Sequence, residues 1–139
     1  MNLGIVFKKA RANKTQIVVA KELNITVGVL SHYENNRSIP SLETFKGICK
    51  YYGLSADILL NIKDISQTPD PRGELLEHKL ANIRDRMKKT QKEMASLIKV
   101  KTSMWSEYEN GKRSPTIKKI QIICEKCKVS ADYLIGINV

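Results

Sequence analysis

Apolar residues recur every three or four positions along the second half of the chain, and this spacing predicts helices. Leu76, Leu80, Ile83 and Met87, for example, share one face of a helix. No segment shows the sustained alternation of apolar and polar residues that predicts a strand. The sequence therefore predicts an all-α fold, with helices at about residues 74–88, 91–98, 102–108 and 117–127 and a short fifth helix that ends near Gly136.

Capping residues mark the ends of these helices. Thr90 and Glu93 form the T-x-x-E capping box that opens a helix. Ser130 is an N-cap for the fifth helix. Gly111 suits the left-handed position just beyond the third helix, and Pro115 precedes the fourth. The helix boundaries are thus predicted by two independent signals.

The chain repeats itself with a shift of 75 residues, without gaps from Arg11 to Ile62. Thr15-Gln16 falls on Thr90-Gln91, and Tyr33-Glu34-Asn35 falls on Tyr108-Glu109-Asn110. The first copy is therefore expected to have helices at about 3–13, 16–23, 27–34, 42–52 and 56–61. Their expected N-caps are Thr15, Thr26, Ser41 and Ser55. Upstream, Lys8 and Lys9 stand where the second copy has Ile83 and Arg84, which indicates a shifted register in the first helix.

The repeat sets the expected domain organisation. Residues 1–62 form a first five-helix domain, residues 63–73 a linker, and residues 74–139 a second five-helix domain. Pro69 and Pro71 in the linker prevent a helix from continuing through it.

Charge narrows the choice of partner. The chain carries 24 Lys and Arg against 14 Asp and Glu, a formal charge of +10. Residues 1–62 carry +4 and residues 74–139 carry +6. A surplus of this size favours a polyanion such as nucleic acid, although many small soluble proteins are simply basic. The chain has no run of about 18 apolar residues and no secretory pattern at its start, so we expect a cytoplasmic protein with no membrane partner.

Candidate catalytic or metal sites are weak. Cys124 and Cys127 form a C-x-x-C pair, but they lie in an apolar helical pattern where cysteine is an ordinary core residue. His32 and His78 occupy unrelated positions of the repeat. Asp57 and Asp132 follow Ser caps, where a carboxylate favours a helix N-terminus. We therefore expect no enzyme, no cofactor and no metal.

The ordered combination of these motifs resembles the lambda-repressor-like, or Cro/Xre-type, helix-turn-helix family. It occurs twice, in TQIVVAKELNITVGVLSHYENNRSIPSLETFKGICKYYGLSADILL and in TQKEMASLIKVKTSMWSEYENGKRSPTIKKIQIICEKCKVSADYLIG. The resemblance covers all but the linker and the extreme termini. It implies two tandem five-helix domains, each with its third helix in the DNA major groove. It also implies a regulator of prokaryotic or phage type, usually a repressor.

The resemblance also implies which residues contact double-stranded DNA. Gln16 and Gln91, which open the second helices, would contact phosphates. Apart from the resemblance, the small and basic turns after the third helices would lay N–H groups and cations along phosphates, or they are simply solvated loops. The basic residues concerned are Arg37, Lys112 and Arg113, together with Lys89 just before the second helix of copy two. Base edges would be read from the early positions of the third helices, which are Val27, Gly28, Ser31 and His32 in the first copy and Thr102, Ser103, Ser106 and Glu107 in the second.

Several readings of these residues stay open. Glu107 could read a base, or it could be a solvated residue or part of an internal salt bridge. Val27 and Gly28 depart from the long polar side chains that are common in the family, so the first copy is expected to read sequence poorly. Trp105 is expected in the core, and the Tyr-Glu-Asn motifs are read as mainly structural.

The main hypothesis is a sequence-specific transcriptional regulator. The alternative is a protein-interaction module of antirepressor or antitoxin type, in which one or both copies do not read DNA, and a homodimer or another protein partner is left open.

Overall fold

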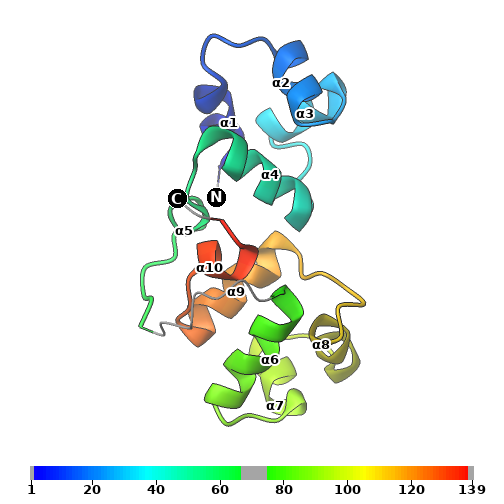
Figure 1. The fold of residues 1–139 in the computed structure, drawn as a ribbon, viewed down its shortest axis with the longest axis vertical. Coiled ribbons are helices and arrows are strands. Elements are labelled where there is room, and N and C mark those ends of the chain that lie inside the picture. Colours follow the sequence, from blue (N-terminus) through cyan, green and yellow to red (C-terminus); the bar gives the residue numbers. More distant parts are fainter. Residues whose placement is uncertain (1, 67–74, 138–139) are drawn as a thin grey trace.

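The computed structural model describes residues 2–66 and 75–137, and within these ranges it contains ten helices and no strand. The first copy comprises α1 (Leu3–Arg11), α2 (Gln16–Glu22), α3 (Val27–Glu34), α4 (Leu42–Tyr52) and α5 (Ala56–Leu59). The second comprises α6 (Leu76–Arg86), α7 (Gln91–Ile98), α8 (Thr102–Glu109), α9 (Ile117–Cys127) and α10 (Ala131–Ile135) (Figure 1). The predicted all-α fold of two tandem five-helix units is confirmed. The bounds at residues 62 and 74 stay a prediction, and Pro69 and Pro71 lie outside the described residues.

The predicted caps are present. Thr15, Thr26, Ser41, Ser55, Thr90 and Ser130 each accept a hydrogen bond from a backbone N–H in the first turn of the following helix. The capping box closes on both sides, at 3.1 Å from Glu93 N to Thr90 Oγ1 and 3.0 Å from Thr90 N to Glu93 Oε1. Gly111 has φ +73°, as expected for the residue beyond α8. These local bonds satisfy donors that the helix interior cannot satisfy.

The first helices are offset by two residues, which confirms the shifted register. Arg11 in α1, and not Lys9, occupies the position of Arg84 in α6, because each arginine pairs with the glutamate at the end of its own third helix. Phe7 and Leu80, four residues before these arginines, are both fully buried. Arg84 therefore lies two residues further from its Thr cap than Arg11 does, and the repeat of 75 residues holds only from the second helix onward.

One continuous hydrophobic core runs through both copies. It joins Phe45 and Ile48 of α4 to Trp105 of α8 and Ile120 of α9, all of which are fully buried or nearly so. Trp105 is thus a core residue, as predicted. A smaller cluster, formed by Val19, Ala20 and Leu30, holds α2 against α3. The two copies are therefore packed together rather than separate.

The three cysteines also lie in the core. Cys49, Cys124 and Cys127 are free thiols and buried. Burial raises the pKa of Cys49 to about 12 and that of Cys127 to about 11, and it raises the pKa of Cys124 as well. At neutral pH these thiols stay protonated, so the C-x-x-C pair packs as an apolar element, as its surroundings in the sequence indicate. Among the described residues, no three His, Cys, Asp or Glu side chains are grouped so that they could hold a metal ion.

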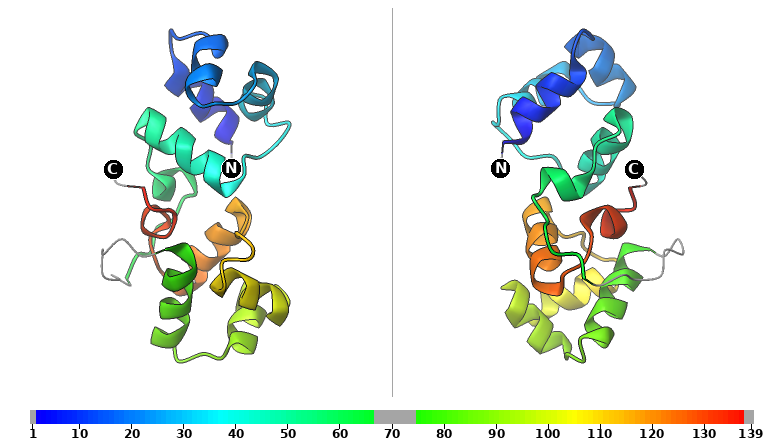
Figure 2. Two further views of the ribbon diagram at one scale, coloured as in Figure 1. Left: turned by 45° about the vertical axis from the view of Figure 1, so that its right-hand side comes forward. Right: turned by 90° about the vertical axis from the view of Figure 1, so that its left-hand side faces the viewer.

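Two carboxylates cross between the copies, which corrects the local interpretation of their role. Asp57 was expected at the N-terminus of its own helix, but it accepts hydrogen bonds from Ser130 Oγ and Ala131 N, both at 2.5 Å. Asp132 likewise accepts from Ser55 Oγ and Ala56 N, both at 2.6 Å. Each carboxylate thus caps the last helix of the other copy, and α5 lies beside α10 at the middle of the molecule (Figures 1 and 2).

Candidate nucleic-acid interface

The second and third helices of each copy form a helix-turn-helix. In copy one α2 packs against α3, and in copy two α7 packs against α8. The turns contain Asn24 (φ +58°) and Lys99 (φ +65°), each in a left-handed conformation. In Figure 1, α3 and α8 lie at opposite ends of the molecule and on its right-hand side. The left view of Figure 2 keeps them on one side.

A buried carboxylate organises the helix-turn-helix of copy one. Glu34, at the end of α3, has a side chain with no exposed surface. It receives two hydrogen bonds from Arg11 of α1, at 2.8 and 3.0 Å, and one from Gln16 Nε2 of α2, at 2.9 Å. Arg11 also donates to the carbonyl oxygen of Lys14. The network therefore ties the first three helices together at the point where α2 begins.

The electrostatics of this network favour its ionised form. Burial by itself raises the pKa of Glu34, but the hydrogen bonds from Arg11 and Gln16, together with the positive charge of Arg11, outweigh it and lower the pKa. The hydrogen bond to Glu34 raises the pKa of Arg11, against the opposing effect of burial. The pair is thus charged over the whole physiological range.

Copy two repeats the network with the same residue types. Arg84 Nε donates to both oxygens of Glu109, at 3.0 and 3.1 Å, and Gln91 Nε2 donates to Glu109 Oε2 at 2.9 Å. Arg84 also donates to the carbonyl oxygen of Lys89. A glutamine amide has two N–H groups, and in each copy the hydrogen bond to the glutamate uses one of them. The Tyr-Glu-Asn motifs are predicted from the sequence to be mainly structural, but this role of their glutamates was not predicted. The recurrence of Gln and Glu at equivalent positions was the signal that the sequence offered, while the offset of the first helices hid the arginines.

The first turn of α8 presents hydroxyl groups. Thr102 and Ser103 are exposed, whereas Ser106 and Glu107 are partly exposed. Glu107 forms an ion pair with Arg113, at 2.8 Å from Nε to Oε2. This is the internal salt bridge that the sequence left open as one reading. The pair holds Arg113, which follows the turn after α8, against the exposed side of that helix.

The corresponding surface of copy one is less polar. Val27, Gly28 and His32 are exposed, and Ser31 is partly exposed. Ile17 and Val18, at the start of α2, are 69% and 44% exposed. Neither was singled out from the sequence, where both fit the apolar periodicity of a helix.

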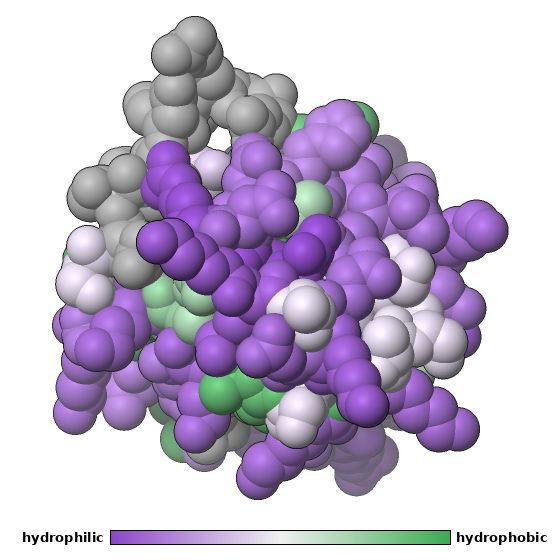
Figure 3. Space-filling model, turned by 90° about the horizontal axis from the view of Figure 1, so that it is seen from below, coloured by the Kyte–Doolittle hydropathy of each residue, from purple (hydrophilic) through white to green (hydrophobic). Residues whose placement is uncertain are grey.

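Copy two carries Lys92 and Glu93 in place of that apolar pair. The end of the molecule that carries α7 is mainly hydrophilic (Figure 3). The two helix-turn-helix surfaces therefore share one backbone arrangement and differ in surface chemistry.

The basic residues expected at phosphates lie near these helices. Arg37, Lys112 and Arg113 follow the third helices and are exposed. Lys89 precedes α7 and is partly buried. Within residues 2–66 and 75–137, none of the helices is both long and apolar enough to cross a membrane.

Comparison with known proteins agrees with this geometry. A helix-turn-helix family model matches residues 7–59 and 80–134, so both copies are covered from the first helix to the last. A relative in Vibrio cholerae serotype O1, the cryptic phage CTXphi transcriptional repressor RstR, is 33% identical over 61 residues. The match covers 44% of this chain and 54% of the repressor, so the chain spans about half the length of this curated relative. No solved structure matches the chain. Because the family model covers most of the sequence in two successive segments, the chain belongs to the lambda-repressor-like helix-turn-helix family and carries two tandem copies of its domain.

Proposed function

We propose that the protein binds double-stranded DNA in a sequence-specific manner and represses transcription. The observation that carries the proposal is the paired Arg-Glu-Gln network, which holds the start of α2 and of α7 in the same way in both copies. A helix N-terminus with a free amide N–H beside it attracts a phosphate. The net charges of +4 and +6 on the two copies and the match to a phage repressor support the same conclusion.

Within this function the two copies have different tasks. In copy two, Thr102, Ser103, Ser106 and Glu107 provide polar groups for base edges. Glu107 reaches a base only if its bond to Arg113 opens, so we assign Arg113 and Lys112 to phosphates in the complex. In copy one, His32 and Ser31 are the polar groups beside Val27 and Gly28, while Gln16 and Arg37 bind phosphate. Copy two therefore specifies sequence more strongly than copy one.

Selection of binding sites from random duplexes tests this proposal. We expect an asymmetric site with one strongly specified half. Combining Ser103→Ala with Glu107→Ala relaxes the preference more than combining Ser31→Ala with His32→Ala, which serves as the control on the third helix of copy one. If selection recovers no preferred sequence from the intact protein, sequence-specific binding is refuted. A reporter gene behind the selected site, unchanged when the protein is expressed, would refute repression alone.

The exposed apolar pair favours a second function for copy one. Ile17 and Val18, with Val27 at the start of α3, place branched apolar side chains where copy two has Lys92, Glu93 and Thr102. Such side chains fit a protein surface better than a phosphate backbone. In this alternative, copy two binds DNA and copy one binds a protein. If this alternative holds, changing Ile17 to Lys and Val18 to Glu leaves the affinity for DNA unaltered. If copy one contacts DNA, the same change alters the affinity.

A further inference from the structure

We propose that a single chain acts as its own dimer: its two copies are locked about a pseudo-twofold axis and read two inverted half-sites on one duplex, so that one chain occupies one operator. This inference rests on the proposed DNA binding. It adds the stoichiometry of the complex, the relative orientation of the half-sites and a fixed spacing between them.

The reciprocal caps establish the pseudo-twofold relation. Asp57 and Asp132 are equivalent in the repeat, and so are Ser55 and Ser130. Asp57 contacts the Ser130 end of α10, while Asp132 contacts the Ser55 end of α5. An interface in which residue i contacts j and j contacts i is isologous, which is the arrangement that a twofold axis generates. A head-to-tail packing of the copies would not repeat the same contact in both directions.

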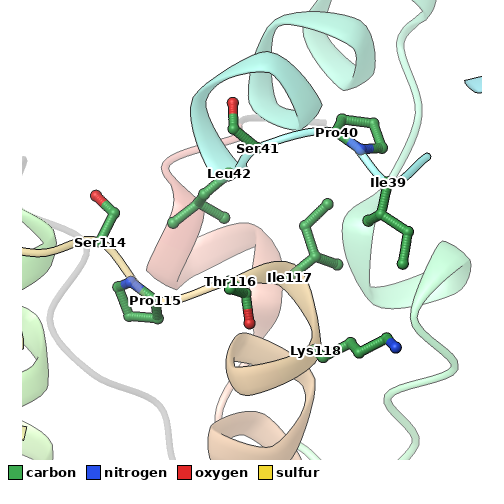
Figure 4. Close-up of a pocket in the computed structure, with 9 residues that line it drawn as sticks. All are labelled: Ile39, Pro40, Ser41, Leu42, Ser114, Pro115, Thr116, Ile117 and Lys118. Carbon is green, nitrogen blue, oxygen red and sulfur yellow. The ribbon is translucent and has the colours of Figure 1, made fainter. Parts of the chain in front are cut away.

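A pocket between the copies gives an independent sign of the same axis. Its volume is about 510 Å³, and it is lined by residues 39–42 of the first copy and 114–118 of the second. These segments are equivalent in the repeat: Pro40 corresponds to Pro115, and Leu42 to Ile117. Figure 4 shows the start of α4 and the start of α9 facing each other across the pocket. Equivalent residues meet in this way where a twofold axis passes between them.

Further contacts restrain the two copies against each other. The amide of Gln121 in α9 donates to the carbonyl oxygen of Leu60 at 3.0 Å. Lys128 of copy two pairs with Asp64 at the start of the linker, at 3.7 Å from Nζ to Oδ2, which holds the linker against copy two. The continuous core described above buries side chains of both copies together. The spacing between α3 and α8 is therefore set by a packed interface, not only by residues 63–73 of the linker.

The placement of the third helices suits this arrangement. Because α3 and α8 lie on one side of the molecule and at its opposite ends, both can face one duplex (Figures 1 and 2). Helix-turn-helix dimers place two such helices in successive turns of the major groove, and their twofold symmetry matches inverted half-sites. In this protein both helices belong to one chain.

Stoichiometry and spacing test the proposal on the intact protein. The duplex recovered by site selection is titrated, and the mass of the complex is measured by ultracentrifugation. We expect one chain per duplex. Inserting five base pairs between the half-sites turns one of them by about half a helical turn. We expect the affinity to fall by about 100-fold, which is the scale of a lost second contact.

The outcomes separate this inference from the proposed function. If the protein binds no duplex, both the proposed function and the single-chain dimer are refuted. Two chains on each duplex, or an affinity that does not respond to the insertion, overturns the single-chain dimer and leaves DNA binding intact.

A variant of the interface provides the structural control. Combining Asp57→Ala with Asp132→Ala removes the reciprocal caps, and we expect the penalty for the insertion to shrink about tenfold because the copies are then less firmly aligned. Asp85→Ala, at an exposed carboxylate of α6, should retain the full penalty. If the double variant responds to spacing as the natural protein does, the caps do not align the copies and the proposal fails. If it does not fold, the spacing series on the natural protein decides alone.

Discussion

Replacing Glu34 by alanine tests how strongly the buried network holds the fold. The carboxylate has no exposed surface and accepts three hydrogen bonds, two from Arg11 and one from Gln16. Removing one partner of a buried ion pair costs about 3–5 kcal/mol. Because the Arg11 side chain is 18% exposed and keeps its bond to the Lys14 carbonyl, we expect the lower end, about 3 kcal/mol. In chains somewhat larger than this one, each kcal/mol of lost stability lowers the melting temperature by roughly 2–4 °C. For Glu34→Ala we therefore expect the melting temperature to fall by about 10 °C.

The chain provides a local probe for this experiment. Its single tryptophan, Trp105, is fully buried in copy two, whereas Glu34 lies in copy one. Urea unfolding is followed by far-UV circular dichroism for all helices and by tryptophan fluorescence for copy two. Because one core and the reciprocal caps join the copies, we expect both signals to shift together. Glu109→Ala should act similarly from within copy two.

The exposed ion pair of Glu107 and Arg113 supplies the matched control. Solvent screens such pairs, so Glu107→Ala should leave the unfolding midpoint unchanged. A loss below about 1 kcal/mol for Glu34→Ala would show that the network contributes no more than an exposed pair does. A tryptophan midpoint that stays in place while the dichroism signal splits into two steps would show that the copies unfold independently.

Three further predictions concern pH, glycine and salt. Burial, reinforced by the neighbouring carboxylate and opposed by its hydrogen bonds, raises the pKa of Asp132, so the folded state holds this proton more tightly than the unfolded state. The contribution of Asp132 to stability should therefore grow as the pH falls from 7 through this raised pKa and be complete below the ordinary pKa of about 3.9. Glu34, whose pKa is lowered, acts in the opposite direction, so the measured quantity is the difference in melting temperature between the natural protein and Asp132→Asn as a function of pH; a difference that does not change with pH would contradict this assignment. Gly4→Ala should lower the melting temperature, because its Cβ atom would lie 2.4 Å from a backbone carbonyl oxygen of α3. Gly47→Ala in α4 is the control: its Cβ atom would have nothing within 4 Å, so the free energy of unfolding should rise by about 0.5–1 kcal/mol. Equal effects of the two substitutions would refute the clash. Lys112→Ala should reduce the slope of log K against log salt by about 1, measured by fluorescence anisotropy with a labelled duplex, and an unchanged slope would remove this lysine from the phosphate contacts.

Local signals in the sequence were sufficient for the helices but not for the contacts between them. Thr90 with Glu93, and the Ser and Thr caps, act within four residues, so the sequence predicts where those helices begin. The partners of Asp57 lie more than 70 residues away, and nothing near that residue distinguishes a cap on its own helix from one on α10. The pair of Arg11 and Glu34 was hidden for another reason: the register of α1 is offset by two residues, so the repeat aligned Lys9 with Arg84.

The surface of copy one shows a different limit of sequence reasoning. Ile17 and Val18 fit the periodicity of α2 as well as Val19 and Ala20 do, yet only the latter two are buried. Four consecutive apolar residues at the start of a helix point to more sides of the helix than the single side that packs against the core. Which of them reaches solvent therefore depends on the position of α3, which periodicity does not give.

The reciprocal caps also bear on how such a regulator would respond to its own abundance. A protein that must assemble from two subunits loses its active form on dilution, and occupancy of its operator then follows roughly the square of its concentration. In this protein the two copies pair within one chain, through Asp57 and Asp132. A regulator of this kind has no separate subunits to dissociate or to exchange with related proteins. The occupancy of its operator would follow the first power of its concentration. The response would then be graded: at low occupancy, half the concentration of protein would repress about half as strongly. A sharp threshold would then have to come from outside the chain.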